Sequence, residues 1–333
     1  MCMDIYRSYD NAEVISRSLA GIRKNGLVKR LESSFYAFCK SLKAFRQANE
    51  NMIDMWENDK IFIAPDLDIN ALIEAGYSEE EIEQKMNEKA EVNPKNASFQ
   101  RKDFDEDYIV QLRYDQALLD DMWLEWEYIN DDDDSKFAKF EDLLKHELFK
   151  KERNPEGKIV VFSESVDTVE YLQRRINRQD VLVISSQNRS QLFKTIRENF
   201  DANWKQRKDE YSIILTTDVL AEGVNLHRSN IIINYDTPWN ATRLMQRIGR
   251  VNRIGSKAGI IYNYVFYPSR QGNKEIKLNQ IALYTEAVLF VYDGTSELPF
   301  ERSRCAATFS NECTREFGTP CDIINGNGFA LCP

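Results

Sequence analysis

Four residues near position 250 have the types and the spacing to bind a polyanion. They are a glutamine, a glycine and two arginines at positions i, i+3, i+4 and i+7: Gln246, Gly249, Arg250 and Arg253. This spacing puts all four on one face of an α-helix. A triphosphate would suit two neighbouring arginines, because each planar guanidinium matches a pair of phosphate oxygens. The alternative is a solvated helix face that carries arginine for solubility.

Polar residues follow two apolar runs upstream of this helix. The run 212–215 is followed by Thr-Thr-Asp at 216–218, and the run 231–235 is followed by Asp236. In an open parallel α/β sheet, ligands bind beyond the carboxyl ends of the strands. The sequence therefore predicts a ligand site that these polar residues share with the arginine-bearing helix.

Three segments of this region resemble conserved motifs of the superfamily-two helicases. They follow the order and spacing of that family: Lys158 to Ser163 (motif IV), Thr217 to Asn225 (motif V) and Gln246 to Arg253 (motif VI). The resemblance is to the bacterial-type members of the Swi/Snf-type branch in particular. It rests on two segments: Trp239 and Asn240 before the helix, and Arg253-Ile254-Gly255 at its end. The resemblance covers residues 155–270 and implies the second RecA-like lobe of such an enzyme.

The resemblance also implies a role for each matching residue. Arg250 and Arg253 would be catalytic arginine fingers that stabilise charge on the transferring γ-phosphoryl group. The nucleotide would be bound by Gln246, Gly223, Asn225 and Gly249. The nucleic acid would be contacted by Thr216, Thr217, Asp218, Ser163, Trp239 and Asn240. We predict no metal ligands in this chain.

ATP and Mg²⁺ are the implied cofactors, and they would bind only together with a first lobe. That lobe carries a phosphate loop of the form Gly-x4-Gly-Lys-[Ser/Thr]. Glu156-Gly157-Lys158-Ile159 lacks both the first glycine and the hydroxyl. We therefore expect the chain to be inactive alone and to have as a partner a first lobe in a longer protein or on another chain.

Asn225 bears on the other implied partner, the nucleic acid. DEAD-box relatives have aspartate at this position, whereas the Swi/Snf branch has asparagine, as this chain does. The resemblance thus favours translocation on duplex DNA without sequence preference over strand separation.

Composition and charge agree with a protein that binds phosphates locally. The net charge is −10, yet residues 151–270 carry 19 basic and 13 acidic side chains. A basic module in an acidic chain is typical of phosphate binding, although chance unevenness is an alternative. No apolar run approaches the roughly 20 residues that span a bilayer. The start of the chain lacks the apolar core of a secretory signal, so we expect a cytoplasmic protein.

From Lys158 onward, strand-like and helix-like segments alternate. Alternation of this kind predicts an α/β fold, a RecA-like parallel sheet with helices on both faces, here preceded by a mostly helical N-terminal part. We expect four regions: a helical leader that packs on the motor lobe (1–59), an acidic helical insertion (60–152), a RecA-like helicase C-terminal domain (153–296) and an irregular tail (297–333).

Several helices are predicted individually. An apolar stripe marks one helix over 27–45, and the resemblance puts its residues 29–34 at the connection between two motor lobes. Ser78 should cap a helix that begins with three glutamates. The other expected helices cover 103–130, a segment starting at Ser135 and capped by the acidic run 131–134, and 274–291.

A different class of function also fits these features. The chain could be a non-catalytic RecA-like scaffold that binds a protein partner through the acidic insertion. In that case Arg250 and Arg253 would be ordinary surface residues. The tail holds four of the six cysteines without any Cys-x-x-Cys pair, so neither a zinc site nor a disulfide framework is favoured there.

Overall fold

The computed structural model describes residues 24–90, 93, 96–220, 223–238, 241–252, 260–276 and 303–309. Contacts divide the chain into two compact units. The helical unit includes Phe38–Asn130, and the sheet unit consists of Asn25–Ala37 together with the chain from Asp131 onward. The contact-based boundaries therefore fall after Ala37 and after Asn130, in place of the expected 59 and 152.

The sheet unit is built on a parallel sheet. Its strands are β3 (Ile159–Phe162), β4 (Val181–Ile184), β5 (Ile213–Thr216), β6 (Ile231–Asn234), β7 (Ile261–Phe266) and β8 (Ser303–Phe309). They lie in the order β4-β5-β3-β6-β7-β8, and every neighbouring pair is parallel. The predicted RecA-like α/β fold is confirmed.

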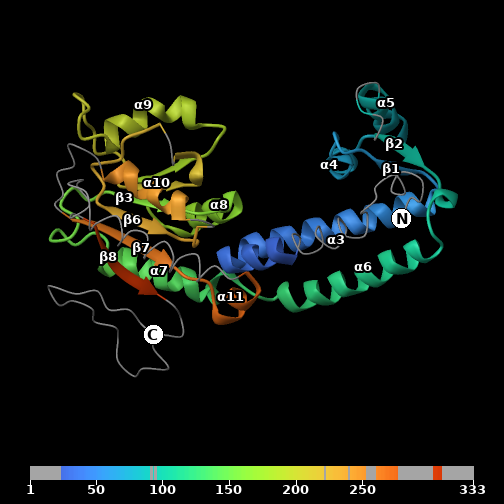
Figure 1. Ribbon diagram of the computed structural model, residues 1–333, viewed down its shortest axis with the longest axis horizontal. Coiled ribbons are helices and arrows are strands. Elements are labelled where there is room, and N and C mark those ends of the chain that lie inside the picture. Colours follow the sequence, from blue (N-terminus) through green and yellow to red (C-terminus); the bar gives the residue numbers. More distant parts are fainter. Residues whose placement is uncertain are drawn as a thin grey trace. The chain divides into compact units, whose positions relative to one another are not determined.

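Helices cover both faces of this sheet, as predicted (Figure 1). Alternate strand residues point to opposite faces. On one face they pack against α7 (Ser135–His146) and α8 (Val166–Arg175). On the other face they pack against α9 (Arg189–Phe200) and α10 (Ala241–Val251).

Helix α7 belongs to the sheet unit, although its residues were expected in the insertion. Its apolar residues are buried in the core beneath the sheet: Phe137, Phe140, Leu143 and Leu144. The predicted cap is present, since the Asp134 carboxylate accepts a hydrogen bond from the Phe137 N–H at 3.0 Å. Before it, the short 3-10 helix η2 (Asp131–Asp133) takes up the rest of the acidic run.

The predicted helix over 27–45 is interrupted. Residues 24–33 are helical, Ser34 is not, and α3 then runs from Phe35 to Glu57. The Ser34 hydroxyl accepts a hydrogen bond from the Ala37 N–H at 3.1 Å, the pattern of a residue that caps a new helix. The break permits Asn25–Ala37 to join the sheet unit while the rest of α3 belongs to the helical unit.

The helical unit is organised around two long helices. They are α3 and α6 (Asp107–Trp126), and the latter lies within the predicted 103–130. The pair is antiparallel, because Phe38 contacts Trp126 and Arg46 pairs with Asp120 further along. The remaining elements are β1 (Ile61–Ile63), α4 (Ile69–Glu74), α5 (Glu79–Ala90), β2 (Ala97–Phe99) and the 3-10 helix η1 (Arg101–Asp103).

The expected cap of α5 is confirmed. The Ser78 hydroxyl accepts from the Glu81 N–H at 3.4 Å, and the Glu81 carboxylate accepts from the Ser78 N–H at 2.8 Å. These two hydrogen bonds form a capping box. The strands β1 and β2 pair antiparallel beside a small apolar core around Trp56 and Phe104.

Two later segments differ from expectation. Helix α11 spans Arg270–Ile276, so it begins before Lys274, and the rest of the predicted helix lies outside the described residues. Residues 303–309 form β8, inside the tail that was expected to be irregular. This strand forms by parallel pairing with β7. The sequence pattern did not indicate it, because strand formation depends on such long-range pairing. Among the described residues, no helix combines the length and apolarity that crossing a membrane requires.

Candidate nucleotide and nucleic-acid site

The carboxyl ends of three neighbouring strands lie level with one another. The register sets Phe162 at the end of β3 beside Thr216 of β5 and Asn234 of β6. The residues that follow these strands therefore emerge along one edge of the sheet. They include Glu164, Asp218 in the 3-10 helix η3 (Asp218–Leu220), and Asp236. The predicted gathering of polar side chains at this edge is confirmed.

Arg247 is the centre of this edge. Its guanidinium makes three hydrogen bonds: Nε to Asp218 at 2.8 Å, Nη1 to Asn234 at 2.9 Å and Nη2 to Glu164 at 3.0 Å. The side chain is fully buried, and its guanidinium lies over the ring of Phe162. A buried charge requires such pairing, because removing it from water is otherwise very costly. Arg247 therefore fixes α10 against the ends of three strands.

Arg247 was not among the predicted site residues. On α10 it lies between the buried apolar face, formed by Leu244, Ile248 and Val251, and the face that carries Gln246 and Arg250. Two features of the sequence could have indicated Arg247. It is a charged residue at the border of an apolar helix face, and acidic residues follow two of the predicted strands.

Glu164 lies among charges of both signs at this edge. Burial raises the pKa of Glu164, and the Arg247 guanidinium offsets this only in part because Asp218 adds a like charge. Arg243 supplies a second cation from α10: its Nη1 lies 2.5 Å from Asp218 and 3.6 Å from Glu164. Two arginines of α10 thus share two carboxylates of the sheet edge.

The predicted face of α10 lies beside the loop between β5 and β6. Gln246, Gly249 and Arg250 are half-buried on α10. The Leu226 N–H donates to the Arg250 carbonyl at 2.9 Å, which brings the loop residue Asn225 next to the arginine. The structure therefore brings motifs V and VI together. Arg253, Trp239 and Asn240 lie outside the described residues.

Gly223 has a backbone conformation that favours glycine. Its φ is +84°, and a Cβ built on it would meet Nη2 of Arg189 at 2.5 Å. Arg189 begins α9, and the sequence analysis did not single it out. The loop thus offers an exposed backbone beside a guanidinium, a geometry compatible with close approach of a phosphate.

Two predicted nucleic-acid contacts need correction. Thr216 is fully buried, and its hydroxyl donates to the carbonyls of Ile184 and Thr217. Ser163 is fully buried as well, and its hydroxyl donates to Asp236 at 2.5 Å. Neither hydroxyl faces solvent in this structure, so neither reaches a phosphate in it. Thr217 and Asp218 are half-buried at the same edge.

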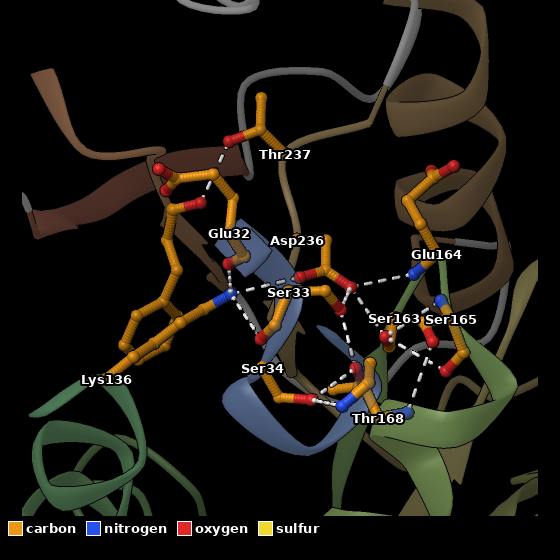
Figure 2. Close-up of polar contacts among 12 residues, drawn as sticks. Glu32, Ser33, Ser34, Lys136, Ser163, Glu164, Ser165, Thr168, Asp236 and Thr237 are labelled. Atoms are coloured by element: carbon orange, nitrogen blue, oxygen red, sulfur yellow. Dashed lines mark hydrogen bonds and ion pairs between the residues drawn. The ribbon is translucent and has the colours of Figure 1, made fainter. Parts of the chain in front are cut away.

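Asp236 anchors a second polar cluster, next to the first (Figure 2). Its carboxylate accepts hydrogen bonds from Ser33 and from the Glu164 N–H, each at 2.9 Å, and from Ser163. Its other oxygen lies 3.0 Å from the Lys136 ammonium. Burial alone would raise the pKa of Asp236, but Lys136 and these hydrogen bonds lower it below the ordinary value. Asp236 is therefore held as a carboxylate.

Comparison with known proteins adds to this geometry. Residues 135–255 match the family described as helicase conserved C-terminal domain. We call this matched part of the chain, residues 135–255, the helicase domain. The match begins at the first residue of α7 and includes α10, so the helicase domain contains Glu164, Asp218 and Asp236.

The helicase domain is similar to several named proteins. A probable eukaryotic initiation factor 4A of Trypanosoma cruzi is 31% identical over 35% of this chain and 28% of its own length. An uncharacterised ATP-dependent helicase, YqhH of Bacillus subtilis, is 32% identical over 32% of this chain and 19% of its own length. The matched part of the chain thus spans less than a third of either relative.

Among solved structures, the C-terminal part of the Fun30 ATPase domain is similar over 62% of this chain and 66% of that chain. Its TM-score is 0.35 and its sequence identity is 15%.

Proposed function

We propose that this chain supplies the second motor lobe of an ATP-dependent DNA helicase or translocase. The observation that carries the proposal is the placement of α10 within a helicase C-terminal domain. Buried Arg247 holds α10 at the carboxyl edge of the sheet, and the half-buried Arg250 lies beside the Asn225 loop. This arrangement suits an arginine that acts on a nucleotide held by a facing lobe.

In this proposal the residues of the chain bind and orient ATP from one side. ATP with Mg²⁺ supplies the γ-phosphoryl group that is transferred, and the facing first lobe supplies the phosphate loop. The fit is supported by the exposed Gly223, whose backbone lies beside the Arg189 guanidinium. Gln246, Gly249 and Asn225 would position the nucleotide, and Arg250 and Arg253 would stabilise charge that develops during transfer.

For the polynucleotide, we propose duplex DNA and a Swi/Snf-like branch. Asn225 in place of the DEAD-box aspartate supports this choice. Thr217 and the loop backbone near Gly223 are the contacts that the geometry favours. Asp218 is bound to both Arg243 and Arg247, so its role would be to hold α10 rather than to touch a strand. RNA remains the competing polynucleotide, because some similar proteins are named as RNA helicases.

The test is the ATPase activity of the complete protein, with this chain and its first lobe. Duplex DNA should stimulate turnover, and Arg250→Ala should lower kcat on the order of 10³-fold. Arg250→Lys should restore little, because lysine lacks the planar fork. Arg178→Ala, which removes an ion pair with Asp180 between α8 and β4, is the matched control and should retain wild-type activity.

Three outcomes would change the proposal. Unaltered turnover in Arg250→Ala would reject the arginine-finger role and favour the scaffold alternative. Stimulation of ATP turnover by single-stranded RNA but not by duplex DNA would mean that the polynucleotide is RNA. A metal-dependent ATPase rate from this chain alone, lost in Arg250→Ala, would show that the catalytic site lies within the chain.

A further inference from the structure

The two polar clusters of the helicase domain meet at one residue, Glu164. Its backbone N–H donates to Asp236, while its carboxylate accepts from Arg247 on α10. Figure 2 shows the Glu164 side chain pointing away from Asp236 while its nitrogen faces it. Asp236 in turn accepts from the Ser33 hydroxyl. A chain of hydrogen bonds therefore runs from Ser33 to Arg247 through two acidic residues.

Ser33 belongs to a segment that is bound to the helicase domain along its length. We call residues 25–37 the connector. Arg30 donates to Asp167 at 2.8 Å, and Ser34 shares a hydrogen bond of 2.9 Å with Thr168. Glu32 accepts from the Ser269 N–H at 2.7 Å. The connector is therefore docked on α8 and on the segment after β7 by polar contacts.

Electrostatics also join the connector to Glu164. Lys29 lies on the same helical stretch as Ser33, and burial lowers its pKa to about 8 against the opposing charge of Glu164. Glu164 therefore interacts with a cation of the connector as well as with Arg243 and Arg247. Release of the connector would remove Lys29, one of the positive charges that stabilise the buried Glu164 carboxylate.

Glu164 is placed where a small backbone shift can act on both clusters. It is the second residue after β3 and lies in a bend, outside the strand ladder. Its N–H and its side chain are attached to the same Cα, so movement of Asp236 or of the connector would alter both contacts. The fully buried Arg247 cannot replace a lost carboxylate with water.

We propose that Glu164 is a positioning residue that couples docking of the connector to the orientation of α10. The proposal deepens the proposed function, because α10 carries the arginine finger, but the coupling itself does not depend on which reaction the protein catalyses. When the connector is docked, Ser33 and Asp236 hold the Glu164 backbone, and its carboxylate holds Arg247. When the connector is released, α10 loses one of its three anchors.

Amide hydrogen exchange on the full chain tests the coupling without any activity. Ser33→Ala removes a connector hydroxyl and touches no residue of α10. Exchange should become several-fold faster in α10 around Arg247 as well as in the connector. Glu164→Gln should accelerate exchange in both segments, and the double variant should accelerate exchange in α10 no more than Glu164→Gln alone. Glu141→Gln, which breaks an exposed ion pair with Lys145 on α7, is the matched control.

The outcomes are distinct. Faster exchange in the connector of Ser33→Ala with unchanged exchange in α10 would overturn the proposal. Additive effects in the double variant would overturn it as well, because independent contacts add. Equal acceleration in β3 and β5 would indicate general loss of stability and would also count against it. If Ser33→Ala does not fold, Arg30→Met removes the hydrogen bonds of the connector to Ser165 and Asp167 and has the same expected pattern.

A second measurement separates this proposal from the proposed function. In the complete protein, Ser33→Ala should lower kcat of the ATPase several-fold with little change in KM for ATP, because Ser33 touches no nucleotide contact. Absence of ATPase activity with intact coupling in hydrogen exchange would reject the motor function alone. Normal kcat in Ser33→Ala together with uncoupled exchange would reject the positioning role alone.

Discussion

One oxygen of Asp218 binds Arg247 twice: Oδ1 lies 2.8 Å from Nε and 2.7 Å from Nη2. The second oxygen, Oδ2, is left for Arg243 at 2.5 Å. The loop after β5 and the helix after β6 are therefore joined by a shared ion pair, of which only the Arg247 end is fully buried. The two arginines differ in exposure and should differ in their contribution to stability.

Arg247→Met should lower the free energy of unfolding by about 3–5 kcal/mol, because it leaves Glu164 and Asp218 without their buried partner. The matched change Arg243→Met should cost less than about 1 kcal/mol, since that side chain is 45% exposed. Urea unfolding followed by circular dichroism would measure both. Equal losses for the two variants would contradict the burial argument.

Gly223→Ala should destabilise the helicase domain by about 1–2 kcal/mol, because an L-residue at its φ of +84° is strained. Gly249→Ala is the matched control on α10, where an added Cβ meets nothing within 4 Å. That change should stabilise the helix by roughly 0.5–1 kcal/mol. Thermal unfolding of the two variants checks the sign, which should be opposite.

The pH dependence of stability should include a contribution from Lys29, whose pKa falls from 10.5 to about 8 on burial. Between these values the unfolded chain binds more protons at Lys29 than the folded chain does. The free energy of unfolding should therefore rise with pH through this window and be lowest below it. The difference between wild type and Lys29→Met, measured from pH 7 to pH 10, isolates this group.

Lys145→Met on α7 controls for the loss of one exposed lysine. A wild-type advantage over Lys29→Met that stays constant or falls as pH rises would mean that Lys29 is not held in the environment described.

The chain alone should bind DNA weakly, with a Kd of roughly 10⁻⁴ M or weaker at physiological salt, because one lobe supplies only half of the phosphate contacts. Binding should weaken as salt rises and should not depend on base sequence. Fluorescence anisotropy across a salt series gives the slope. A slope of zero would rule out binding through phosphates.

The sheet could be predicted from sequence because its strands are short, continuous apolar runs. The run 212–215 overlaps β5 over residues 213–215, and the run 231–235 differs from β6 by one residue. Buried parallel strands have this pattern because both of their faces are covered. The site was predictable to the extent that it follows from strand ends, as with Asp218 and Asp236.

What the sequence did not reveal depends on contacts between distant residues. The apolar stripe over 27–45 continues across Ser34, so its spacing could not indicate the break at Ser34, whose hydroxyl shares a hydrogen bond with Thr168. In the same way, the exposure of Thr216 depends on its neighbours Ile184 and Thr217. A motif position predicts a residue's type and place along the chain, but not whether its hydroxyl is already engaged.

The contact between Ser33 and Asp236 spans 203 residues of chain. During synthesis on a ribosome, the connector emerges long before its acceptor exists. At ordinary elongation rates the interval is about 10 to 40 s, far longer than a helix needs to form. Residues 24–33 therefore lack this docking partner during that interval, which leaves the segment accessible to chaperones in the nascent protein.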